Sequence, residues 1–184
     1  DESITVICNG EIYNYVELKN DLINHGYNFK SGSDTEVLIY LYELYGSKML
    51  HLLNGMFAFS IWDNKKKVLF IARDRMGIKP LYYTNANDRF IFASELKSIL
   101  MNENANPSIN KNAIADYLQL GYIPNTSSPY KGINKLLPGH YIVYDANGMQ
   151  IKRWWDISKL PIEEKKELYD NNFLADQFDK SINL

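Results

Sequence analysis

Alternating strand-like and helix-like patterns open the chain. Residues 3–8 form a short apolar run rich in β-branched residues, and this run stops at Asn9-Gly10. A β-strand that ends in a turn at this dipeptide is therefore expected. Over residues 15–25, apolar positions recur among charged ones as on one face of a helix, and Gly26 provides a C-terminal stop. The opening pattern predicts a strand, a turn and a helix, in that order.

A second helix is predicted to begin at residues 33–36, where Ser-Asp-Thr-Glu has the spacing of a capping box. In that arrangement the Ser33 hydroxyl accepts a hydrogen bond from the Glu36 amide, and the Glu36 carboxylate accepts one from the Ser33 amide. Apolar residues then recur at helical intervals up to a stop at Gly46. A third, shorter helical piece is expected to follow and to end near residue 54.

From residue 56 onward the pattern changes to short alternating runs separated by polar turns, which is typical of β-hairpins. Hairpins are expected over residues 56–72, 81–92 and 141–154. Helical patterns over residues 95–101 and 110–120 lie between the last two of these hairpins. Because helices cluster early and strands late, the pattern predicts an α+β fold with a largely antiparallel sheet system.

The character of the chain changes again beyond Asp156, where a strongly charged stretch is followed by a weak helical pattern from Phe173. We interpret residues 1–156 as one domain, and residues 157–184 as a linker and the start of a second domain. A chain of 184 residues is long enough for one such domain with a sizeable core.

Composition and charge argue against several classes of function. The net charge is -2 and the densest cationic run is only Lys65–Lys67, so nucleic-acid binding is not expected. Apolar stretches are too short to cross a membrane and the chain opens without a leader pattern, which favours a cytoplasmic protein. A single cysteine, Cys8, and 3 scattered histidines offer no metal-ligand spacing, so neither a metal nor a cofactor is expected in this domain.

Short segments in a fixed order point more specifically to a family. They are Asn-Gly-Glu-Ile-Tyr-Asn at 9–14, Ser-Asp-Thr-Glu at 33–36, Gly-Met-Phe-Ala-Phe at 55–59 and Arg-Asp-Arg-Met-Gly-Ile-Lys-Pro-Leu-Tyr-Tyr at 73–83. Together they resemble the class II glutamine amidotransferases, and the resemblance runs nearly to Asp156. Segments 92–95, 121–124 and 138–140 narrow it toward the asparagine synthetases. Sugar-phosphate and phosphoribosyl amidotransferases fit less well.

The resemblance implies an N-terminal-nucleophile hydrolase fold, an αββα sandwich. In this family an N-terminal cysteine attacks the side-chain amide of glutamine, and the ammonia released passes to a second active site. For the parent protein it implies ATP-dependent synthesis of asparagine from aspartate, with ATP and Mg²⁺ bound in a synthetase domain outside this chain. Two alternatives stay open: a donor domain that serves a different acceptor, and a degenerate, non-catalytic amidotransferase-like module. Oligomeric state, including a homodimer, also stays open.

By the same resemblance, the Asn9 side-chain amide and the Gly10 backbone N–H form an oxyanion hole, the set of donors that stabilises developing negative charge. Glu11 and Asp34 are the carboxylates that bind the α-ammonium group of glutamine. Alone, each residue has another interpretation, since Asn-Gly is the commonest hairpin-turn dipeptide and an acid at a helix start is stabilising in any case. Only the joint occurrence of the segments favours the catalytic interpretation.

Cys8 lies beside the proposed oxyanion hole, yet it falls within a predicted strand. The nucleophile of the family is residue one of the mature chain, because its free α-amine is part of the mechanism, and position one here is Asp1. We therefore expect the chain to begin partway into the domain, truncated before its opening strands and nucleophile. On that expectation this fragment alone is inactive.

Three other polar residues receive a structural interpretation. Arg73 and Asp74 are expected to form a buried ion pair that orders the loop leading to Pro80. His140 is expected to be a turn histidine with ordinary hydrogen bonds.

Overall fold

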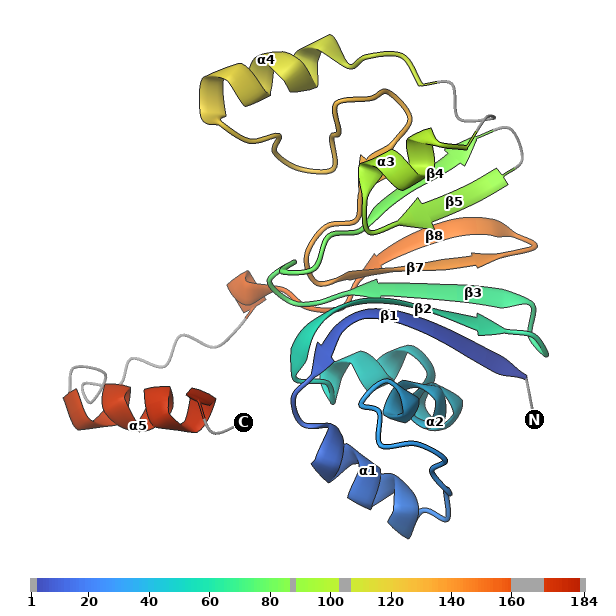
Figure 1. Ribbon diagram of the computed structural model, residues 1–184, viewed down its shortest axis with the longest axis vertical. Helices are drawn as coiled ribbons and strands as arrows, with labels where there is room; N and C mark the ends of the chain where they lie inside the picture. The colour runs from blue at the N-terminus through green and yellow to red at the C-terminus, as the bar shows by residue number, and fades with distance from the viewer. Residues whose placement is uncertain (1–2, 87–88, 103–106, 160–170, 183–184) are drawn as a thin grey trace.

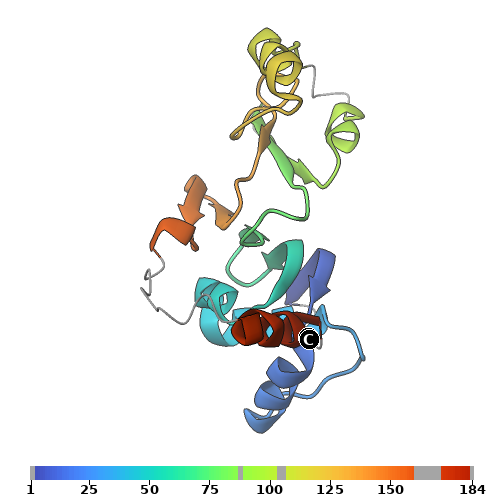
Figure 2. The same cartoon turned by 90° about the vertical axis from the view of Figure 1, so that its left-hand side faces the viewer.

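Two β-sheets stacked between helices make up the body of the protein. The computed structural model describes residues 3–86, 89–102, 107–159 and 171–182 (Figure 1). Helices α1 (Tyr15–Asn24) and α2 (Glu36–Tyr45) lie at one end of the stack. At the other end lie α3 (Leu96–Leu100) and α4 (Lys111–Leu120), and the view turned by 90° has the same order (Figure 2). This helix–sheet–sheet–helix order confirms the expected α+β sandwich.

Every strand pairing in the described part of the chain is antiparallel. The larger sheet has five strands in the order β1 (Ile4–Ile12), β2 (Gly55–Asp63), β3 (Val68–Arg73), β7 (His140–Asp145) and β8 (Gly148–Arg153). The smaller has three, in the order β5 (Arg89–Ala93), β4 (Tyr82–Ala86) and β6 (Asn134–Lys135). The three expected hairpins are therefore confirmed, whereas the two-residue strand β6 was not predicted.

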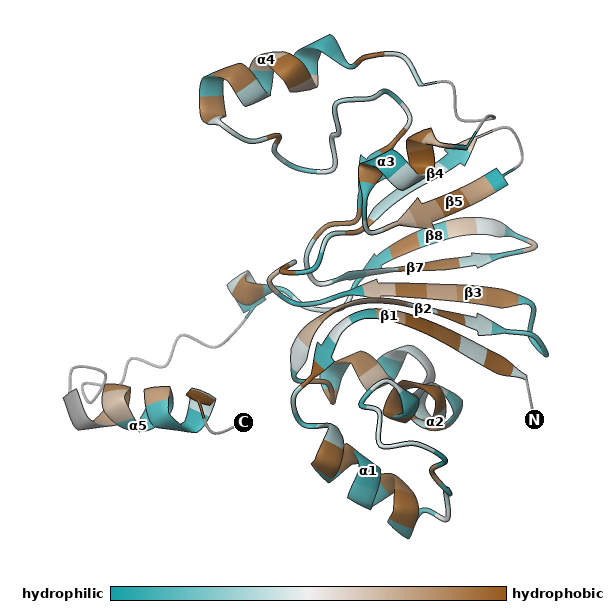
Figure 3. Ribbon diagram, in the orientation of Figure 1, coloured by the Kyte–Doolittle hydropathy of each residue, from teal (hydrophilic) through white to brown (hydrophobic). Residues whose placement is uncertain are grey.

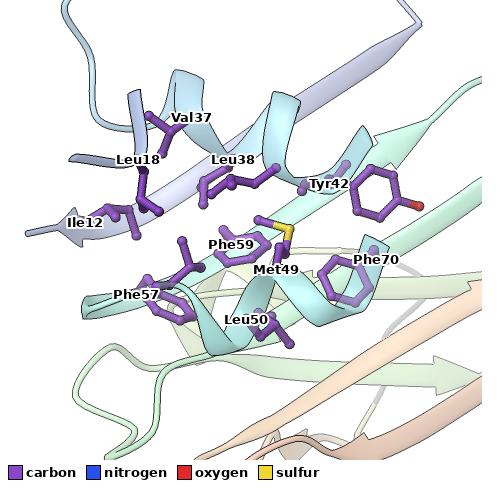
Figure 4. Close-up of a cluster of buried hydrophobic side chains, with 14 of the residues drawn as sticks. Ile12, Leu18, Val37, Leu38, Tyr42, Met49, Leu50, Phe57, Phe59 and Phe70 are labelled. Carbon is purple, nitrogen blue, oxygen red and sulfur yellow. The ribbon is translucent and has the colours of Figure 1, made fainter. Parts of the chain in front are cut away.

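Two apolar cores hold these layers together, one on each face of the larger sheet. The first lies between that sheet and the helices α1 and α2 (Figure 4). The second lies between the two sheets. Strand β2 serves both, because successive side chains of a strand point to opposite faces: Phe57 and Phe59 enter the first core, and Ala58 enters the second. Each fully buried large apolar side chain stabilises the fold by roughly 1.5–3 kcal/mol.

Two local predictions for the start of the chain are wrong. Strand β1 does not end at Asn9-Gly10 but continues to Ile12, paired residue by residue with β2. The capping box also does not form, because α2 has Thr35 at its N-cap and no side-chain capping bond. The Glu36 carboxylate instead accepts hydrogen bonds at 2.8 Å from the backbone amides of Lys30 and Ser31.

The remaining helical segments are η1 (Gly46–His51), η2 (Ile157–Lys159) and α5 (Asn171–Ile182). The expected third helical piece is the 3-10 turn η1, which supplies Met49 and Leu50 to the first core. Apolar positions concentrate on the strands of the larger sheet, but α4 and α5 also carry some (Figure 3). None of the helices in the described ranges is long and apolar enough to cross a membrane.

Candidate active site on the open edge of β1

Strand β1 is the outermost strand of the larger sheet among the described residues. At its two ends, the Tyr13 amide donates to the Asn54 carbonyl and the Asn64 amide donates to the Ser3 carbonyl, each at 2.8 Å. Antiparallel ladders alternate between residues that bond the partner strand and residues whose backbone groups point away from it. The odd-numbered residues of β1 therefore bond β2, and the N–H of Gly10 points to the open edge.

Only glycine fits at position 10. The backbone φ of Gly10 is +151°, and a Cβ atom there would lie 2.1 Å from the Met56 carbonyl oxygen and 2.6 Å from the Phe57 Cα. Both contacts are with the backbone of β2, which cannot move aside without disrupting the ladder. The close approach of β1 and β2 at this point is therefore possible only because glycine has no side chain.

The Asn9 side chain projects from the opposite side of β1 to Cys8, toward the space between the two sheets. Its Nδ2 donates a hydrogen bond of 2.9 Å to the Ser94 hydroxyl, which directly follows β5. Asn9 and Ser94 both line a cavity of about 250 Å³. A side-chain amide donor and the backbone donor of Gly10 are thus adjacent along the chain, at the open edge of the sheet.

Asp34 reaches the same edge from the loop before α2. Its Oδ2 accepts a hydrogen bond of 2.8 Å from the backbone N–H of Ile12, two residues beyond Gly10 and with the same outward direction. The other oxygen, Oδ1, receives longer contacts from the Thr35 hydroxyl at 3.3 Å and the Ser33 hydroxyl at 3.5 Å. Asp34 is therefore held by β1. The expected capping box would have placed it in the first turn of the helix, but α2 begins only after Thr35.

Glu11 completes the group of candidate residues. It lies on β1 opposite Met56, its side chain is exposed, and it follows the donors Asn9 and Gly10 directly. The structure therefore brings all four candidate residues, Asn9, Gly10, Glu11 and Asp34, to one end of one strand edge.

Sequence reasoning gave no role to Ser94, although its segment, residues 92–95, was part of the family resemblance. Among the described residues, no three histidine, cysteine or acidic side chains group as metal ligands.

Comparison with known proteins shows the family of the chain. A family described as "Glutamine amidotransferase domain" matches residues 1–155. The chain belongs to this family. It is 37% identical over 158 residues to asparagine synthetase [glutamine-hydrolyzing] 3 of Bacillus subtilis, a match that covers 85% of this chain and 26% of that protein. It is 40% identical over 172 residues to putative asparagine synthetase [glutamine-hydrolyzing] 2 of Methanocaldococcus jannaschii, covering 91% of this chain and 33% of that protein.

A solved structure supports the fold of this amidotransferase domain. The glutamine phosphoribosylpyrophosphate amidotransferase of B. subtilis superimposes with a TM-score of 0.58 and 24% identity, over 83% of this chain and 29% of that one. The similarity to this structure is one of fold. The chain spans about a quarter to a third of the length of the asparagine synthetases that it matches.

The lone thiol of the amidotransferase domain is poorly suited to attack a substrate. Cys8 packs against the first core, and burial raises the pKa of its thiol to about 11, with the Asp34 carboxylate adding to the rise. The Thr35 hydroxyl and the Lys79 ammonium act in the opposite direction but do not offset it. Because the thiolate is the nucleophilic form, Cys8 is a weak nucleophile at neutral pH.

Arg73 and Asp74 order the loop to Pro80, as expected, but not through the expected ion pair. Among the described residues, each of the two side chains bonds to backbone groups instead. The Arg73 guanidinium donates to the carbonyls of Gly77 and Lys79, each at 2.7 Å, and to that of Leu136. The Asp74 carboxylate accepts from backbone amides at 3.0–3.2 Å, namely those of Phe57, Met76, Ile78 and Lys79. His140 has the expected ordinary hydrogen-bonding contact, with its Nδ1 2.8 Å from the Pro138 carbonyl, but it is the first residue of β7, paired with Arg153, and not a turn residue.

Proposed function

We propose that, within its parent protein, this amidotransferase domain binds glutamine at the open edge of β1, where the side-chain amide is hydrolysed to glutamate and ammonia. The observation that supports this most directly is the outward direction of the Gly10 N–H beside the Asn9 amide. When a nucleophile attacks the amide carbonyl, the carbonyl oxygen becomes an anion. The two donors are adjacent and can stabilise that oxygen together, and each such donor typically accelerates turnover about 100- to 1000-fold.

The same edge offers groups for the α-ammonium end of glutamine. Asp34 uses Oδ2 to accept from Ile12, which leaves Oδ1, with its two longer hydroxyl contacts, as the oxygen directed to substrate. Glu11 provides a second, exposed carboxylate one residue beyond Gly10. Carboxylates bound to an ammonium group make charge-assisted hydrogen bonds, which are about twice as strong as neutral ones. In this arrangement the carboxylates hold one end of glutamine while the donors stabilise the reacting end.

We further propose that the domain is the ammonia-producing part of an ATP-dependent asparagine synthetase. The support is the similarity to two proteins named as asparagine synthetases, of which this chain spans only a part. On this proposal aspartate, ATP and Mg²⁺ bind in a synthetase domain, and the protein acts in the cytoplasm. Residues 1–156 then form the glutamine domain and 157–184 the start of the connection, a boundary supported by the family match to residues 1–155.

Replacing Asn9 by alanine tests the proposal in the intact enzyme. Loss of one oxyanion donor should lower glutamine-dependent turnover by about 100-fold or more, while synthesis supplied with free ammonia persists. Steady-state rates with each nitrogen source measure the two activities separately. Asn20→Ala, at an exposed position of α1, is the matched control and should leave both rates unchanged. Equal loss with both nitrogen sources would show that Asn9 has a structural role instead.

A further inference from the structure

Ser94 connects the candidate oxyanion donor to the second sheet. It directly follows β5 and lies half-buried, and its Oγ accepts a hydrogen bond of 2.9 Å from the Asn9 Nδ2 on β1. The two residues are 85 positions apart in the sequence. The bond therefore links the end of one sheet to the edge of the other, beside the cavity of about 250 Å³ that both residues line.

This bond fixes the direction of the Asn9 amide. The terminal torsion of an asparagine side chain is broad and roughly two-fold, so an amide without an anchor rotates and can exchange its oxygen and nitrogen. The amide nitrogen carries two hydrogens. One is used on Ser94, which leaves the second to face a substrate and keeps the Oδ1 acceptor away from the position of the developing anion.

We propose that Ser94 is a positioning residue that holds Asn9 in the orientation required of an oxyanion donor. This inference rests on the proposed glutaminase function. Ser94 does not touch the reacting atoms, and its contribution is made through the Asn9 amide. Its effect should therefore appear in the transition state, where the anion forms, and not in the binding of neutral glutamine amide.

The bond is not needed for the fold itself. Asn9 is exposed and Ser94 is half-buried, so neither polar group would be left buried without a partner if the other were removed. The two sheets are held together by the second core, which includes Ala58, Leu81 and Leu136. Loss of the Ser94 hydroxyl should thus shift the melting temperature by only about 3 °C or less.

The test is a set of variants of the intact enzyme assayed with glutamine. Ser94→Ala should lower kcat roughly 10- to 30-fold with little change in KM, since the donor remains but is no longer held. Ser94→Thr, which keeps the hydroxyl, should stay within about 3-fold of the parent, whereas Ser94→Val, of the same shape without it, should behave like Ser94→Ala. Ser98→Ala, at an exposed serine of α3, is the control.

A double-mutant cycle with Asn9→Ala separates this inference from the proposed function. If Ser94 acts only through Asn9, the double variant should be no slower than Asn9→Ala alone. Normal turnover of Asn9→Ala would refute the oxyanion role itself. If Asn9→Ala is slow, two results would refute the positioning role only. One is normal turnover of Ser94→Ala, and the other is a double variant whose loss of turnover is the product of the two single losses. Equal rates of Ser94→Thr and Ser94→Val would also overturn the positioning role, as would a Ser94→Ala variant with a raised KM and unchanged kcat. If Ser94→Ala does not fold, the comparison of Ser94→Thr with Ser94→Val decides.

Discussion

Replacing Gly10 by alanine tests whether the close approach of β1 and β2 requires a residue without a side chain at this position. The added Cβ would lie 2.1 Å from the Met56 carbonyl oxygen, far inside van der Waals contact, at a backbone φ of +151°. Holding a non-glycine residue in such a conformation costs about 1–3 kcal/mol. Separating the strands to relieve the contact also weakens the neighbouring ladder bonds, each contributing about 1 kcal/mol. With two such bonds lost, the free energy of unfolding should fall by roughly 3–5 kcal/mol.

Denaturant titration followed by circular dichroism measures this loss. Gly121→Ala is the matched control, because Gly121 also has positive φ, +78°, but a Cβ there would meet nothing within 4 Å. That variant should lose only the backbone term, about 1–2 kcal/mol. An equal loss in both variants would mean that the contact with β2 costs nothing. A neutral Gly10→Ala would refute the steric reasoning altogether.

Two further predictions concern the acid and the thiol beside the site. Asp34→Asn should raise KM for glutamine more than it lowers kcat, with a stability loss of about 1 kcal/mol because the hydrogen bond accepted from the Ile12 amide is no longer charge-assisted. A large fall in melting temperature with unchanged kinetics would contradict a binding role. Iodoacetamide should alkylate Cys8 about 100-fold more slowly at pH 8 than a free thiol, because its pKa is raised to about 11, and Cys8→Ser should retain glutamine-dependent turnover. Folding raises the pKa of the Cys8 thiol, so the neutral thiol contributes fully to stability below the pKa of the unfolded chain, and this contribution is lost as the pH rises toward about 11. Rapid alkylation of Cys8 near neutral pH would contradict its description as a weak nucleophile.

Patterns of short range predicted most of the elements correctly. The helix expected over residues 15–25 is α1, and the three expected hairpins form with antiparallel registers. Asn110 caps α4 by accepting from the Ala113 amide, and Gly121 ends that helix in the left-handed conformation. These features depend on residues a few positions apart, so the sequence contains the information needed to predict them.

The errors lie where a local preference competed with a distant partner. Asn9-Gly10 favours a turn, but β2, more than 40 residues later, offers a continuous antiparallel partner and the dipeptide remains in the strand. Ser33 and Glu36 have capping-box spacing, yet Glu36 binds the backbone of the preceding loop at Lys30 and Ser31. The two-residue strand β6 exists only through its pairing with β4 and has no pattern of its own.

The sequence by itself determined the class of fold, the order of the elements and, through its family segments, the four candidate residues Asn9, Gly10, Glu11 and Asp34. Only the tertiary structure decided that the Gly10 N–H points to an open edge, that Asp34 is held by Ile12, and that Ser94 fixes the Asn9 amide. Each of these depends on the register of β1 against β2 or on a contact between distant segments. Such contacts are selected by the packing of the whole chain, because local sequence sets which groups are available but not which of them meet.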